Sequence, residues 1–365
     1  MRRAACNPRN AASPPDRFFE RELAGEEPPS LATLRSLYQG SCELQARKPW
    51  ETMRETQLVL VGDPGSNQMC FCSILGSLGE VFCLHVHLGE EGYGGYLKLQ
   101  SGEMHTSGDF LAVQRSVYLE FERLSRLTAP DRALLRHLGD PLKRGRLAPI
   151  FRSIRPGYHA WYVTEAEART LDHCVRAVIQ VWDRFRQDPE AGYWRAPNRY
   201  PLVAAGAEIR LAALPQPALP MPRVPQVDKR RVEKIRSSQF RPLELLQLDH
   251  FYGAATIGQP HERKALFRVA MAIDGETAFA FPPEVGSPEE PTGDLLARVF
   301  LQAMEMGRIL PREVQVRKPE FQVLLEGLGR ELGIPVRVKP SLPALDFAKS
   351  ELLRMMGDAR LPDNV

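Results

Sequence analysis

A cluster of thiol and imidazole side chains is the part of this sequence that most resembles a metal site. Cys70 and Cys72 lie in one apolar segment, MCFCSILG, and Cys83, His85 and His87 lie in the next, VFCLHVHLG. Alternate residues of a strand share a face, so a hairpin of these segments could gather ligands for zinc. Zinc pairs are usually two to four residues apart, however, and Cys-X-Cys on a flat strand holds its sulfurs apart. This spacing favours the alternative of small apolar cysteines in a buried strand.

A second stretch, KRGRLAPIFRSIRPGYHAWYVTEAEA from residue 143, alternates cations with aromatic rings. Cations interleaved with stackable rings are typical of a surface that binds single-stranded nucleic acid. The alternative is an irregular loop that is anchored by its aromatic residues and turns at Pro156-Gly157. The candidate nucleic-acid-binding residues here are Arg144, Arg146, Arg152 and Arg155.

A third stretch, VDKRRVEKIRSSQFRP from residue 227, is strongly basic. A run of this kind indicates either the solvated face of a helix or a strip that contacts phosphates. Its candidate nucleic-acid-binding residues are Lys229, Arg230, Arg231 and Lys234.

The sequence lacks the usual catalytic signatures. It has no G-x-x-x-x-G-K-[ST], no G-x-S-x-G, no H-E-x-x-H and no paired C-x-x-C. The glycines of EEGYGG lack the strand-to-helix fingerprint of a dinucleotide site. We therefore predict no cofactor.

Length and composition predict two domains. A chain of 365 residues with 43% hydrophobic residues can bury two cores, and its net charge of +3 is too small to demand a polyanionic partner. No run is apolar enough to cross a membrane, and the N-terminal stretch lacks the apolar centre of a signal peptide, so we expect a cytoplasmic protein without membrane contact. Its six cysteines are expected to be reduced thiols.

Composition shifts give the expected boundaries. Residues 1–30 lack periodicity and are expected to form a flexible tail, and five prolines between Pro215 and Pro225 mark a linker that continues through the basic stretch to residue 241. Between them, residues 31–214 alternate short strands with helices, which predicts an α+β domain with a small antiparallel sheet. The clearest helix begins at a capping box formed by Thr164 and Glu167.

The sequence pattern of residues 242–365 predicts an α/β domain. The order of apolar strands and amphipathic helices is β-β-β-α-β-α-β-α, with a hairpin turn at Asp274-Gly275 between two strands in KALFRVAMAIDGETAFAFPPEV. Three strands in a meander followed by alternating helices and strands is the order of the ribonuclease H-like core, a mixed sheet with helices on its faces.

Two resemblances to known families add to this reading. The stretches GSLGEVFCLHVHLGEEGY and PIFRSIRPGYHAWYVTEAEARTLD resemble the signatures of an uncharacterised bacterial domain that usually precedes a second uncharacterised domain. The resemblance covers roughly residues 48 to 211. It implies a shared fold and carries no activity.

The second domain resembles an integrase core in three segments, LQLDHF, VAMAIDGETAFAF and LPREVQVRKPEF. The resemblance implies that Asp249 occupies the position of a metal-binding aspartate. Two-metal chemistry requires another carboxylate at the end of the fourth strand, where this chain has Arg317, so the acidic set is broken. The remaining candidate catalytic acids are Asp346 and Glu351. Alternatively, Asp249 is structural and pairs with a backbone amide or with Arg317.

These observations favour a non-catalytic binding or scaffold protein whose candidate partner is nucleic acid or protein. The competing prediction is a divalent-metal-dependent nuclease or transposase-like enzyme that uses Asp249 with Asp346 or Glu351. A third is protein–protein assembly through an exposed sheet edge.

Overall fold

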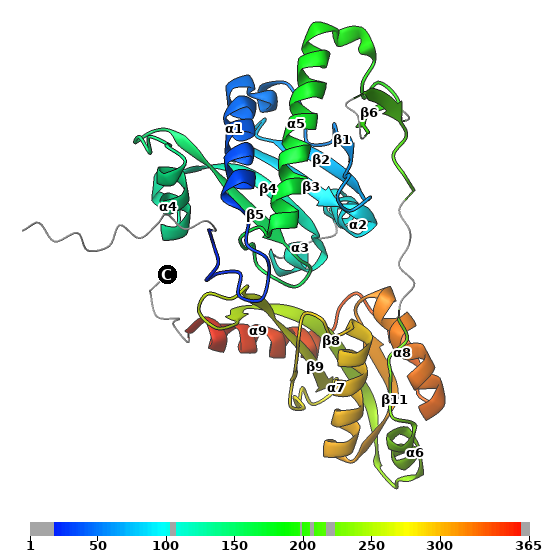
Figure 1. Cartoon of the computed structure of the whole chain (residues 1–365). Coiled ribbons are helices and arrows are strands. Elements are labelled where there is room, and N and C mark those ends of the chain that lie inside the picture. Colours follow the sequence, from blue (N-terminus) through cyan, green and yellow to red (C-terminus); the bar gives the residue numbers. More distant parts are fainter. Residues whose placement is uncertain (1–17, 103–106, 198, 205–207, 217–222, 359–365) are drawn as a thin grey trace, which may run out of the picture.

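The computed structural model describes residues 18–102, 107–197, 199–204, 208–216 and 223–358, which form two layered domains (Figure 1). The strands of the first domain are β1 (Val59–Gly62), β2 (Met69–Leu75), β3 (Cys83–Leu88), β4 (Ser116–Arg123), β5 (Leu147–Ile154), β6 (Tyr200–Val203) and β7 (Ile209–Ala212). They form one sheet in the order β5-β4-β3-β2-β1-β6-β7. All neighbours are antiparallel except β1 and β6, which pair in parallel.

Helices cover both faces of this sheet. On one face lie α1 (Leu31–Arg47) and α5 (Glu165–Gln187), and on the other lies α2 (Gly89–Gln100). The predicted capping box of α5 is confirmed, because the Thr164 hydroxyl accepts from the Glu167 amide and the Glu167 carboxylate accepts from the Thr164 amide. Shorter helical elements complete the domain: η1 (Pro49–Glu51), α3 (Ser107–Val113), η2 (Leu124–Arg126), α4 (Ala129–His137) and η3 (Pro189–Ala191).

The sheet is larger than the sequence predicted. A seven-stranded mixed sheet replaces the expected small antiparallel one, because β5, β6 and β7 were not predicted as strands. β5 lies inside the stretch for which an irregular loop anchored by aromatic residues was one alternative, and it contains Pro149. Proline is tolerated there because β5 is an edge strand.

The predicted flexible tail is also too long. Phe18, Phe19 and Leu23 are buried in the first-domain core, and the Phe19 ring stacks on Tyr162 with ring centroids 4.4 Å apart. These apolar side chains fix a segment whose overall composition suggested mobility. Residues 1–17 of the predicted tail lie outside the described residues.

The second domain contains a five-stranded sheet. Its elements are α6 (Lys229–Ser237), β8 (Arg241–Ile257), β9 (Ala265–Asp274), β10 (Glu284–Gly286), α7 (Thr292–Gly307), β11 (Ile309–Val316), α8 (Pro319–Leu332), β12 (Val336–Val338) and α9 (Pro343–Asp358). The strand order is β10-β9-β8-β11-β12, with β8, β11 and β12 parallel and β9 antiparallel to both of its neighbours. Helices α7 and α8 pack on one face and α9 packs on the other.

Two expectations for this domain need correction. The strand after the Asp274-Gly275 turn does not form in AFAF; only Ala280 bridges to Ile273, and the left-handed φ of 58° at Ala278 interrupts the extended chain. The third strand is instead the short β10. The basic part of the predicted linker is likewise folded, since Val232 and Ile235 of α6 are buried in the second-domain core.

The hairpin of β8 and β9 joins the two domains (Figure 1). The His159 amide donates to the Lys264 carbonyl at 2.8 Å, and the Leu266 amide donates to the Gly157 carbonyl at 2.8 Å. Within the described part of the chain, no helix is long and apolar enough to cross a membrane.

Candidate functional site

Asp249 lies in the middle of β8, and Arg317 directly follows β11. The two strands are parallel neighbours whose pairing ends with Val316 opposite Leu248, so the next residues, Arg317 and Asp249, lie side by side. The Arg317 Nε donates to Asp249 Oδ2 at 2.9 Å, and the His250 amide donates to Asp249 Oδ1 at 2.8 Å. The predicted pairing of Asp249 with Arg317 is therefore present, and the Asp249 side chain in this pair is only 3% exposed.

The same guanidinium reaches a second carboxylate. Arg317 Nη2 donates to Asp346 Oδ1 on α9, and Nη1 donates to the Pro340 carbonyl at 3.2 Å. Partial burial works to lower the pKa of Arg317, but the hydrogen bond and charge of Asp249 and the charge of Asp346 outweigh it and raise this pKa above its ordinary value. Arg317 is thus held as a cation between two anions.

This arrangement does not fit a divalent metal. A metal bridged by Asp249 and Asp346 would have to approach the guanidinium that already joins them, and like charges repel strongly at such distances. The third predicted acid, Glu351, pairs with Arg354 at 2.8 Å instead. Across the described residues, no group of three or more His, Cys, Asp or Glu side chains could hold a metal ion.

The predicted zinc cluster fails because of sheet register. Cys70 lies opposite Leu88 and Cys72 opposite Val86, whereas His85 and His87 lie opposite Ser73 and Phe71, so the sulfurs and the imidazoles point to opposite faces. Cys70 and Cys72 belong to the core beneath α5, next to Cys174, whereas Cys83 shares the face of His85 and His87. His85 and His87 stack on each other with ring centroids 4.5 Å apart.

Family models match both domains of the chain. Residues 35–199 match the model of a domain of unknown function, DUF7309, and residues 231–353 match that of a second one, DUF6930. The chain therefore combines two domains of unknown function, each matched by its own family model. The DUF6930 model begins within α6, which agrees with the packing of that helix on the second core. None of the curated proteins matches the chain.

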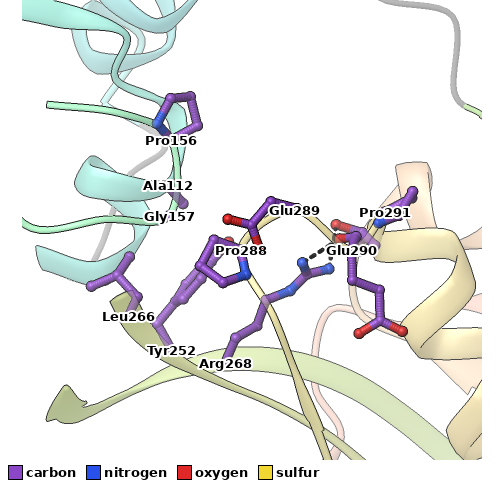
Figure 2. A pocket seen from close by; sticks show the side chains of 11 residues that line it. Ala112, Pro156, Gly157, Tyr252, Leu266, Arg268, Pro288, Glu289, Glu290 and Pro291 are labelled. Atoms are coloured by element: carbon purple, nitrogen blue, oxygen red, sulfur yellow. Dashed lines mark hydrogen bonds between the residues drawn. The ribbon is translucent and has the colours of Figure 1, made fainter. Parts of the chain in front are cut away.

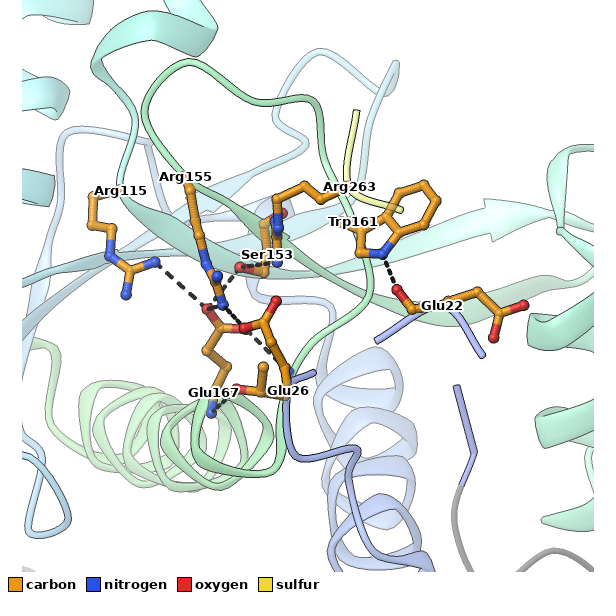
Figure 3. A network of polar contacts seen from close by, with 9 residues as sticks. Glu22, Glu26, Arg115, Ser153, Arg155, Trp161, Glu167 and Arg263 are labelled. Carbon is orange, nitrogen blue, oxygen red and sulfur yellow. Dashed lines mark hydrogen bonds and ion pairs between the residues drawn. The ribbon is translucent and has the colours of Figure 1, made fainter. Parts of the chain in front are cut away.

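The predicted cations of the DUF7309 domain separate into two groups. Arg152 is held by Asp131 through contacts of 2.5 and 3.0 Å. Arg155 pairs with Glu26 and Glu167 (Figure 3). Neither guanidinium is therefore free for an external phosphate. Arg144 is exposed, and Arg146 is partly exposed.

The cations of α6 in the DUF6930 domain also separate. Arg231 forms two contacts with Glu305, at 2.9 and 2.7 Å, which fasten α6 to α7. Lys229, Arg230 and Lys234 are exposed, and within the described ranges none of them forms an ion pair.

A charged cluster at the domain contact was not predicted. Arg263 of the β8–β9 connection donates to the Ser153 carbonyl at 3.0 Å, next to Arg155 and the Glu167 carboxylate (Figure 3). Burial, and then the charge of Arg155, lower the pKa of Arg263 to about 10. The cluster joins residues that are far apart in sequence, so no local sequence motif predicts it.

A cavity of about 240 Å³ lies beside this contact, between Gly157 and Pro288 (Figure 2). Its buried cation, Arg268, donates to the carbonyls of Ser287 and Glu290 and to the Thr292 hydroxyl. Through these bonds Arg268 fixes the conformation of the loop that precedes α7. The neighbouring imidazole of His250 is buried, and within the described residues neither of its nitrogens has a partner.

Proposed function

We propose that the DUF6930 domain is a ribonuclease H-like core whose acidic centre has become an ion-pair site, and that the protein binds a partner and does not cleave it. The strand order β10-β9-β8-β11-β12, with one antiparallel meander and two further parallel strands, supports the fold assignment. Asp249 lies on the central strand β8, which supports its correspondence to the metal-binding aspartate of integrase cores.

The bridge from Arg317 to Asp249 and Asp346 carries the proposal. A two-metal centre needs carboxylates that remain available to divalent ions, whereas both of these carboxylates face a fixed cation. A buried ion pair of this kind stabilises one arrangement of side chains but supplies neither a Lewis acid nor an activated water.

The exposed cations favour nucleic acid over protein as the partner. Lys229, Arg230 and Lys234 on α6 and Arg144 in the first domain have no acidic partner within the described residues, so they could contact phosphates. The competing function is a divalent-dependent nuclease in which Asp249 acts with Asp346 or Glu351. The pairing of Glu351 with Arg354 argues against it.

A cleavage assay with the full chain tests this proposal. Labelled DNA and RNA, single- and double-stranded, are incubated with the protein in Mg²⁺ or Mn²⁺, and Asp249→Asn is assayed in parallel. We expect no divalent-dependent product from either protein. Cleavage by the wild type that disappears in Asp249→Asn would overturn the proposal in favour of the nuclease.

A metal titration gives a second readout. We expect Mn²⁺ to leave the melting temperature of the wild type unchanged and to raise that of Arg317→Asp, because this substitution removes the cation and supplies a third carboxylate. Stabilisation of the wild type by Mn²⁺ would contradict the proposal.

A further inference from the structure

Positive charge is concentrated in one segment of the first domain. Residues 123–146, RLSRLTAPDRALLRHLGDPLKRGR, contain seven Lys and Arg and two Asp, a net charge of +5. The whole chain carries +3, so all the remaining residues together carry −2. This concentration cannot be seen from the total charge, and it differs from the average composition of a solvated surface.

The fold turns the two acidic residues of this segment inward. Asp131 is engaged by Arg152, with its side chain 4% exposed. Asp140 accepts from the Tyr38 hydroxyl at 2.9 Å and from the Leu142 amide at 2.8 Å, with its side chain 1% exposed. Neither carboxylate therefore neutralises the outer surface.

Most of the cations, in contrast, face solvent at a corner of the domain; Arg126 pairs with Glu122, and Arg132 donates to the Leu124 carbonyl. The segment comprises the end of β4, η2, α4 and the loop that enters β5, and α4 lies at the side of the domain away from the linker (Figure 1). We call this surface the basic corner. Its cations are Arg123, Arg126, Arg132, Arg136, Lys143, Arg144 and Arg146.

A hollow of about 690 Å³ lies within the basic corner. It is lined by three arginines, Arg123, Arg144 and Arg146, together with Ser125 and backbone of the same two turns. In the described part of the chain, Arg123 and Arg144 form no ion pair, and Arg146 has only a distant one, 3.8 Å from Asp140. Three guanidiniums around one concave space, with almost no internal anion, form a site suited to phosphate groups.

We propose that the basic corner binds the phosphate backbone of nucleic acid, without sequence preference. This inference rests on the proposed binding function and names its partner and surface. Arginine forks match phosphate oxygens, and a concave site can receive a phosphate that projects from a strand. Residues 123–146 contain no Phe, Tyr or Trp that could stack on bases, and Phe151 and Tyr162 of the following stretch are buried, so the backbone is what the corner recognises.

An anionic membrane fits this surface less well. No large hydrophobic side chain is exposed between residues 123 and 146, so the corner offers nothing to insert into lipid. An acidic protein would supply carboxylates, but without the regular spacing of charges that a nucleic acid brings to several arginines at once.

Binding of a labelled oligonucleotide to the full chain, followed by fluorescence anisotropy between about 50 and 200 mM salt, tests the proposal. The test variant carries Arg123→Gln, Arg144→Gln and Arg146→Gln. The matched control carries Arg35→Gln, Lys98→Gln and Lys339→Gln, which removes the same amount of charge from exposed positions outside both the basic corner and α6. A third variant replaces the three arginines of the corner by lysine.

We expect the Gln variant of the corner to bind at least about tenfold more weakly, with a salt slope reduced by about 2, and the control to bind within about twofold of the wild type. The Lys variant should retain most of the affinity, because it keeps the charge. Equal loss in the corner variant and the control would overturn the assignment, as would wild-type binding that is insensitive to salt.

Competing probes separate the alternatives. Inorganic phosphate that displaces the oligonucleotide at equal phosphate concentration would reassign the hollow to a small anion. Binding to vesicles that contain phosphatidylserine, without binding to the oligonucleotide, would reassign the corner to a membrane surface. Either result overturns this inference and leaves the proposed absence of catalysis untouched, whereas divalent-dependent cleavage overturns the latter alone.

Discussion

Arg317 donates from Nε to Asp249 and from Nη2 to Asp346, so one guanidinium joins the central strand of the second sheet to its last helix. The two carboxylates differ in environment: the Asp249 side chain is 3% exposed and that of Asp346 is 45% exposed. Only Asp249 therefore depends on Arg317 for compensation of a desolvated charge.

Removal of this arginine should be costly. We expect Arg317→Ala to lower the free energy of unfolding by about 2 to 4 kcal/mol, because it leaves the Asp249 charge buried without its cation. The control is Arg312→Ala on β11, the strand that directly precedes Arg317; its pair with Glu244 is exposed at both ends and should contribute less than about 1 kcal/mol. Urea unfolding of both variants makes the comparison; equal effects would contradict a special role for Arg317.

The glycines of EEGYGG have a packing role. A Cβ on Gly92 would lie 2.4 Å from the Arg115 carbonyl oxygen, whereas a Cβ on Gly94 would meet nothing within 4 Å. Gly92→Ala should therefore push α2 off the sheet and destabilise the domain by more than about 2 kcal/mol. Gly94→Ala should stabilise it by about 0.5 to 1 kcal/mol through helix propensity. Thermal unfolding of the pair gives the sign of each change, and destabilisation by both would refute this explanation.

Two buried imidazoles and one partly buried imidazole predict a loss of stability at mildly acidic pH. Burial lowers the pKa of His85 to about 4 and that of His250 to about 3, the latter also through nearby cations, and burial together with the charge of His85 lowers the pKa of His87. In the unfolded chain these groups titrate near 6.5. Below pH 6.5 the unfolded state therefore binds more protons, and stability falls until the folded pKa values are reached.

The expected slope is up to about 1.4 kcal/mol per pH unit for each histidine. Denaturant unfolding between pH 6.5 and about 4 measures it. His250→Leu should reduce the slope by about one proton. An unaltered slope in His250→Leu would show that this imidazole is not desolvated.

Local sequence patterns predicted helices and strands better than they predicted which residues contact one another across the fold. The capping box of Thr164 and Glu167 and the alternation around Asp249 are signals within a few residues, and both elements form as expected. The failures concern residues that meet across long separations. Arg152 looked like a free cation until the fold placed Asp131 beside it, and Cys72 looked like a ligand until the register turned it away from His85.

Composition misled in a similar way. The N-terminal segment lacks periodicity, yet a few rings such as Phe19 are enough to fix it, because they fill a gap that only the assembled core defines. The sequence predicted only part of the basic corner. Arg144 was proposed from its aromatic neighbours, whereas Arg123 comes next to it through the pairing of β4 with β5. Sheet pairing of this length cannot be inferred from spacing alone.

The contact between the domains depends on a glycine. Gly157 has a φ of +82°, and a Cβ there would lie 2.8 Å from the Pro288 Cβ across the domain contact (Figure 2). Gly139 has nearly the same φ, +81°, with nothing within 4 Å of its Cβ position, so Gly139→Ala reproduces the backbone strain without the collision. We expect about 1 kcal/mol of destabilisation from Gly139→Ala alone.

Gly157→Ala should cause the same backbone strain and, through the collision with Pro288, also separate the two domains. The Leu266 amide donates to the Gly157 carbonyl, so its hydrogen exchange should accelerate at least about tenfold in Gly157→Ala and stay close to the wild-type rate in Gly139→Ala. Exchange measured by mass spectrometry on peptides that span residues 259–270 reports this amide. Unchanged protection in Gly157→Ala would mean that the loop before α7 yields at Pro288 while the hairpin remains docked.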